Sequence, residues 1–111
     1  MNKKDYWKIL NHLNKKFCNN QIKINKIIFL SKIVNPNRDR GTTYGYYRMK
    51  DKTIAILKDA PTIDKIETLI HEFTHAYQHQ ILGEKLSHDN KGWKIFKKFK
   101  KESDKILRIS V

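Results

Sequence analysis

The sequence predicts a single α+β domain over residues 1–111, and three observations lead to that class. Three segments carry apolar residues at three- and four-residue steps, the spacing of amphipathic helices. Between the first two of them lie β-branched and alternating apolar residues, which are typical of strands. The chain contains no internal repeat and no Gly/Ser-rich linker that would mark a domain boundary.

The first helix is expected over residues 3–17, with Asn19 and Asn20 ending it. Its apolar positions are Tyr6, Trp7, Leu10, Leu13 and Phe17. Residues 22–34, "IKINKIIFLSKIV", are predicted to form a strand. Residues 44–58, "YGYYRMKDKTIAILK", predict two shorter strands joined by a turn near Lys50 and Asp51.

The second helix is expected to begin at Pro61, which suits a first helical turn, and to end at Gly83. Its acidic first-turn residue, Asp64, complements the positive end of the helix dipole. The apolar stripe predicted to face the core consists of Ile63, Ile66, Ile70, Phe73 and Tyr77.

The third helix follows the loop "GEKLSHDNKG" and is expected over "WKIFKKFKKESDKIL", with Asp89 or Asn90 as its cap. We expect Trp93, Phe96 and Phe99 to face inward. The sequence therefore predicts a leading helix, three strands, a central helix and a C-terminal helix.

The formal net charge of +13 favours contact with polyanions, of which nucleic acid is the usual one. The excess is mostly lysine, in a sequence also rich in Ile and Asn, which suits the codon bias of a low-GC bacterium or its phage. Cys18 is the single cysteine, so no internal disulfide forms, and we expect a small buried residue and a reducing, cytoplasmic location. No apolar run reaches membrane-spanning length.

The stretch "LIHEFTHAYQHQ", residues 69–80, carries the chemistry. His71 and His75 are four residues apart, so on a helix they share one face and can bind one zinc ion. Glu72 is rotated about 100° from His71 and can reach a water molecule beside that ion. Bound zinc makes such a water easier to deprotonate, and a carboxylate can take its proton. This is the logic of the HExxH motif.

A catalytic zinc site needs a third protein ligand and one open position. His79 continues the same face, but it lies about 12 Å along the helix from His71, so we expect a surface or supporting role. Glu84, at the helix exit, is one candidate. His88, in the loop before the next helix, is the candidate that we favour.

With these residues, the chain resembles the SprT-like (Spartan-type) zinc metallopeptidase family over most of its length. The resemblance consists of a leading helix with "LNKKF", a strand, "GYY", "TLIHEFTHAYQHQ", and a histidine shortly before an aromatic residue in "SHDNKGWKIF". It implies a zincin-like minimal domain, in which the leading helix and a small three-stranded sheet pack on the HExxH helix. It also implies His71, His75 and His88 as zinc ligands and Glu72 as the base.

The family resemblance further implies endopeptidase activity, often on DNA-bound proteins, with a basic surface that holds the DNA. The surface that we nominate consists of Lys94, Lys97, Lys98, Lys100 and Lys101. An ordinary solvated helix face is the alternative interpretation of those lysines. For the whole chain, the alternative is a non-catalytic nucleic-acid-binding protein with a structural or vestigial zinc site.

Overall fold

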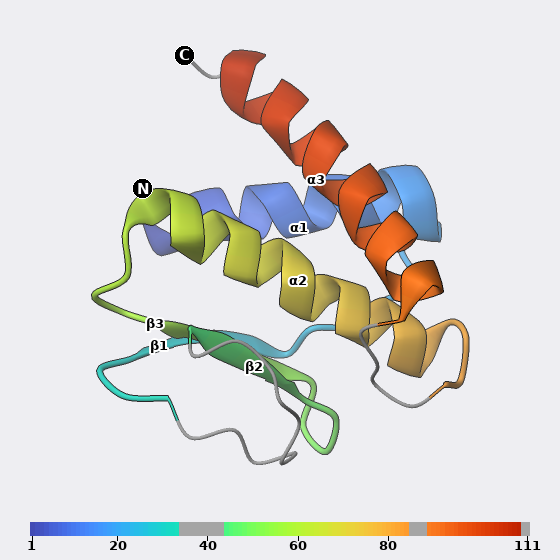
Figure 1. Ribbon diagram of the computed structural model, residues 1–111, viewed down its shortest axis with the longest axis horizontal. Coiled ribbons are helices and arrows are strands. Elements are labelled where there is room, and N and C mark those ends of the chain that lie inside the picture. The colour runs from blue at the N-terminus through green and yellow to red at the C-terminus, as the bar shows by residue number, and fades with distance from the viewer. Residues whose placement is uncertain (34–43, 85–88, 110–111) are drawn as a thin grey trace.

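The computed structural model describes residues 1–33, 44–84 and 89–109, with side chains as far as residue 107. Within these ranges the helices are α1 (Lys3–Cys18), α2 (Thr62–Gln80) and α3 (Asn90–Ile109), and the strands are β1 (Lys26–Leu30), β2 (Gly45–Arg48) and β3 (Thr53–Leu57). The predicted class and order of elements are confirmed: the chain is an α+β domain with a small mixed sheet (Figure 1).

The sheet has the strand order β1-β3-β2. β1 runs parallel to β3, with Ile28 opposite Ala55, and β2 runs antiparallel to β3, with Tyr46 opposite Ala55. At the start of β2, a Cβ atom on Gly45 would collide with the carbonyl oxygen of Ala55 and the methyl group of Thr68. The absence of a side chain at Gly45 therefore lets β2 approach both β3 and α2 closely.

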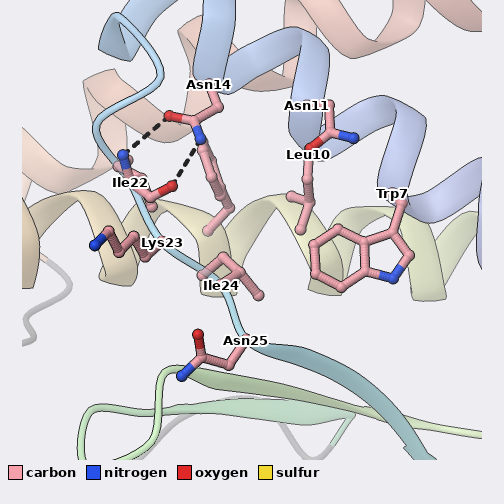
Figure 2. Close-up of a pocket in the computed structure, with 9 residues that line it drawn as sticks. Trp7, Leu10, Asn11, Asn14, Ile22, Lys23, Ile24 and Asn25 are labelled. Carbon is pink, nitrogen blue, oxygen red and sulfur yellow. Dashed lines mark hydrogen bonds between the residues drawn. The ribbon is translucent and has the colours of Figure 1, made fainter.

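β1 is shorter than the predicted strand over residues 22–34. Residues 22–25 stand outside the strand, and side chains of α1 and α2 bond their backbone. The Gln80 side chain accepts from the Lys23 N–H at 2.7 Å and donates to the Lys23 carbonyl at 2.8 Å. The side-chain amide of Asn14 donates to the carbonyl oxygen of Ile22 at 2.7 Å, and its oxygen accepts from the Ile22 backbone N–H at 3.1 Å (Figure 2). Residue 34 of the predicted strand lies outside the described residues.

α2 is the central element of the domain. It packs against β2 and β3 on one side and against α1 and α3 on the other, so that it lies between the sheet and the two outer helices (Figure 1). Its apolar side chains Leu69, Ile70 and Phe73 are fully buried. Being covered on both sides, α2 can bury polar side chains in fixed positions as well.

The residues predicted to end the helices lie at or beside the observed ends. α3 is longer than the predicted 93–107, and Pro61 precedes the first residue of α2 as its N-cap. Asn19 and Asn20, with φ of 52° and 60°, end α1 in the left-handed conformation that asparagine tolerates. Gly83, with φ of 63°, follows α2, and the N–H of Glu84 donates back to the Gln78 carbonyl at 3.0 Å. The Asp89 carboxylate accepts from the Gly92 N–H at 2.8 Å at the start of α3.

Two predicted core positions are wrong. Ile63 has 74% of its surface exposed, and Trp93 has 53% exposed. Both residues stand in the first turn of their helix, where the apolar stripe extends past the elements that cover it. Periodicity identifies the face of a helix that turns inward, but it carries no information about where the neighbouring elements end. The remaining members of the two stripes are buried or partly buried against the core.

Candidate metal centre and the cleft beside it

His71 and His75 face each other one turn apart on α2, as the four-residue spacing predicts. Their ring centroids are 4.7 Å apart and their planes are nearly perpendicular, at 83°. The two Nε2 atoms approach to 3.1 Å. Two nitrogen atoms bound to one tetrahedral zinc ion at ~2.0–2.1 Å would be about 3.3–3.4 Å apart. The imidazole pair therefore fits a shared zinc ion with a small adjustment of the rings.

Gln78 fixes which nitrogen of His75 is available. The Gln78 side-chain oxygen lies 2.8 Å from Nδ1 of His75, and the two side chains are 2% and 3% exposed. Because an amide oxygen only accepts, Nδ1 carries the proton and donates it, which leaves the lone pair of a neutral ring on Nε2. Metal-binding histidines usually donate their second ring N–H to an oxygen acceptor, and the Gln78 amide oxygen supplies one here. The motif analysis missed Gln78, although its position three residues after His75 was a usable signal.

Glu72 lies between the two histidines in the sequence, and its side chain is only 2% exposed. Carboxylates are rarely buried to this extent unless other groups compensate for the loss of water. α2 therefore holds a buried carboxylate at the position directly after His71, at a cost in stability.

The other candidate ligands are placed as follows. The Nδ1 atom of His79 lies 2.9 Å from the Tyr47 hydroxyl, so this histidine is bonded toward β2. The Glu84 carboxylate accepts from the Lys91 ammonium at 2.9 Å. His88, the favoured third ligand, lies outside the described residues. Within the described ranges, no group of three His, Cys, Asp or Glu side chains could hold a metal ion.

A cavity of about 270 Å³ lies directly beside His71. Its walls come from α2, from the first turns of α3 and from Tyr44, which precedes β2. The residues that line it are Tyr44, Asp64, Glu67, Thr68, His71, Trp93 and Phe96. This volume is about that of a large side chain or a short piece of peptide, and the cavity borders His71 of the imidazole pair. Sequence patterns gave no indication of this cavity, because its residues come from three separate segments.

A second cavity, of about 230 Å³, lies between α1 and the extended residues 22–25 (Figure 2). Its floor is apolar and includes Leu10, Ile24 and Phe73, and its rim carries asparagines. Of these, Asn14 bonds the Ile22 backbone, and Asn25 donates to the Asp51 carbonyl at 2.9 Å. Those bonds join α1, the extended segment and the turn after β2, so we assign the asparagines a structural role.

The lysines nominated on α3 divide into two groups. Lys94, Lys97, Lys98 and Lys101 are exposed and follow helical steps of three and four, so they form one stripe, which we call the lysine stripe. Lys97 and Lys98 lie over the rings of Trp93 and Phe17, at 5.4 Å and 4.7 Å from the centroids. Lys100 is partly buried and donates to both oxygens of Asp104, at 3.1 and 3.3 Å. Its charge is therefore partly neutralised inside the protein.

No known family, curated protein or solved structure matches this chain. The SprT-like resemblance therefore rests on the motif residues of this chain alone. Across the described residues, no helix combines the length and the apolar character that crossing a membrane requires.

Proposed function

We propose that this protein is a zinc-dependent endopeptidase of the SprT-like type that acts on DNA-associated proteins. The observation that carries the proposal is the 3.1 Å approach of the His71 and His75 Nε2 atoms, one residue away from a buried glutamate. His71 and His75 would hold the ion, and we propose His88 as their partner from the loop before α3. A zinc ion at this place supplies a Lewis acid that polarises the scissile carbonyl and eases deprotonation of water.

In this proposal, Glu72 moves the protons. Its carboxylate takes a proton from the attacking water as the water oxygen bonds to the carbonyl carbon. The carbon–nitrogen bond then breaks, and Glu72 passes the proton to the departing nitrogen. The products are a carboxylic acid and an amine, and Glu72 returns to its starting state. The burial of its side chain favours a single orientation for both transfers.

The lysine stripe supports the DNA part of the proposal. Four exposed ammonium groups on one face of α3 can follow a phosphate backbone without reading its sequence. α3 also contributes Trp93 and Phe96 to the cavity beside His71. DNA bound along this helix would therefore lie close to the proposed site of cleavage, which would bring DNA-associated proteins to it.

The proposal is tested with Glu72→Gln, which keeps the size of the side chain but removes the base. We expect the variant to bind about one zinc ion per chain and to cleave an unfolded protein substrate about 10²–10⁴-fold more slowly than the wild type. Asp104→Asn is the matched control, because it removes one exposed carboxylate from α3 and should leave cleavage unchanged. Cleavage by Glu72→Gln at the wild-type rate would remove Glu72 from the mechanism.

Elemental analysis tests the metal separately. His75→Ala should lose zinc, whereas His79→Gln, altered one turn further along the same helix, should keep it. Equal zinc content in the two variants would contradict the assignment of the ligand pair. If the wild type binds zinc and DNA but cleaves no protein, the non-catalytic nucleic-acid-binding alternative holds instead.

A further inference from the structure

The cavity beside His71 has one acidic wall. Asp64, Glu67 and His71 follow one another at steps of three and four residues, so they share a face of α2. Glu67 and Asp64 stand about 6 and about 10.5 Å before His71 along the helix axis. A side chain that enters the cavity at His71 therefore approaches the two carboxylates as it extends away from the histidine.

The chain has 24 lysines and arginines, and Asp51, Glu84, Glu102 and Asp104 each have a cationic partner. In the described part of the chain, Asp64 and Glu67 take part in no ion pair, and the same holds for Asp5 and Asp59. The helix dipole accounts for an acidic residue in the first turn, which includes Asp64 but not Glu67. The carboxylates of the acidic wall are therefore available to a cationic group of another molecule.

Aromatic side chains also line the cavity. Trp93 stacks on Phe96, with 5.4 Å between their centroids and 20° between their planes. Trp93 is 53% exposed and Tyr44 is 38% exposed, so both present ring surface next to the cavity. A guanidinium group can stack on such rings while it donates hydrogen bonds to carboxylates in its own plane, which an ammonium group cannot do as well.

We propose that this cavity binds a cationic side chain of the substrate next to the scissile bond, and that it prefers arginine to lysine. The inference rests on the proposed function, since it names the residue that the peptidase would accept beside the cleaved bond. It agrees with the proposed substrates, because proteins that bind DNA place arginine and lysine on its phosphates. In this arrangement the lysine stripe attracts DNA, and the acidic wall attracts the protein bound to that DNA.

The test uses a peptide of alanine, glycine and leucine with one arginine, and a second peptide in which citrulline replaces the arginine. Citrulline has nearly the shape of arginine but no charge. We expect the zinc-loaded wild type to cut next to the arginine with a kcat/KM about tenfold higher than for citrulline, the size of one charge-assisted hydrogen bond. A third peptide, with lysine in place of the arginine, should be cut at a rate between those of the other two. Mass spectrometry of the fragments locates the cut.

The double variant Asp64→Asn, Glu67→Gln should cut the arginine and citrulline peptides at equal rates. The control Asp104→Asn, on the far part of α3, should keep the preference. Circular dichroism and thermal unfolding test whether the double variant is folded. If it is not, the single variant Glu67→Gln replaces it in the comparison of the two peptides. Equal cleavage of the two peptides by the wild type would overturn the inference and leave the proposed function standing.

If the wild type cleaves neither peptide, binding decides the inference alone, and the proposed function fails only if the wild type also cleaves no unfolded protein. Fluorescence anisotropy of the labelled peptides with Glu72→Gln measures that binding at low salt. Tighter binding of arginine than of citrulline, weakened by added salt and lost in a variant that also carries the two acidic-wall substitutions, would support the cavity. Equal binding would overturn it.

Discussion

α2 and α3 are nearly equal in length, at 19 and 20 residues, but they use their polar residues in opposite ways. α2 buries Glu72, His75 and Gln78, each 3% exposed or less, whereas the four members of the lysine stripe on α3 are exposed. Burying polar groups costs stability but fixes them in one geometry. Exposed charged side chains are not fixed in one geometry. Under the proposed function, α2 therefore provides the chemistry, and α3 provides sequence-independent attraction to DNA.

The largest effect expected from this comparison is on stability. Phe73 is fully buried in α2, and its ring lies 5.5 Å from that of Phe99. Phe73→Ala should lower the free energy of unfolding by about 3–5 kcal/mol, a large part of what a small domain has. Trp93→Ala should cost less than about 1 kcal/mol, because that ring is half exposed. Urea unfolding of the two variants compares them, and equal losses would contradict the ranking.

The second effect concerns the metal. Gln78→Leu removes the acceptor of the His75 Nδ1–H bond while it keeps the side chain large and buried. Zinc affinity should fall about 10–100-fold, because the imidazole loses the group that orients it. Gln78→Glu restores an acceptor and should recover most of the affinity. Competition with a zinc chelator measures the three dissociation constants, and an unchanged affinity in Gln78→Leu would show that the bond has no role in orienting the ligand.

The ends and faces of the helices were the most predictable part of this protein. Asn19, Gly83 and Asp89 were identified as helix-end residues because each satisfies a local requirement of the backbone. The meeting of His71 and His75 followed from the helical repeat in the same way. Burial of Cys18 was expected too, and burial raises the pKa of its thiol to about 11, so that it stays protonated near neutral pH.

What the sequence did not predict depends on contacts between distant segments. β1 begins only at Lys26, and the backbone just before it is bonded instead by helix side chains, with Asn14 at Ile22 and Gln80 at Lys23. The cavity beside His71 needs Trp93 and Tyr44 to be brought to α2 by the rest of the fold. No local pattern contains that information, because each wall alone resembles an ordinary amphipathic surface. The third ligand predicted from the motif, His88, stays a prediction.

A smaller effect is expected from the side-chain bonds that link α3 to α1. Glu102 accepts from His12 at 2.8 Å and from Lys16 at 2.9 Å, and these bonds hold the pKa of its carboxyl below the usual value. A carboxyl whose pKa is lower in the folded protein stabilises it above its unfolded pKa, about 4.3, and that contribution is lost as the pH falls through the lower folded value. Glu102→Gln should therefore be less stable than the wild type at pH 7, and the difference should shrink below pH 4. Thermal unfolding across this range checks it, and a gap that widens in acid would contradict the assigned partners.

The smallest effect is expected on DNA binding by the lysine stripe. The same measurement distinguishes the stripe from Lys100 beside it. Each phosphate contact of a lysine contributes about 0.9 to the slope of log K against log salt for duplex DNA. Lys97→Gln and Lys101→Gln should each reduce that slope by up to this amount, with only a modest loss of affinity at low salt. Lys100→Gln should change it less, because Asp104 already pairs with that ammonium group. Titration of a labelled duplex at four salt concentrations measures the slopes. If the slope falls by the same amount in all three variants, DNA binding depends on the net charge of the whole protein, and the lysine stripe is not a specific DNA-binding face of α3.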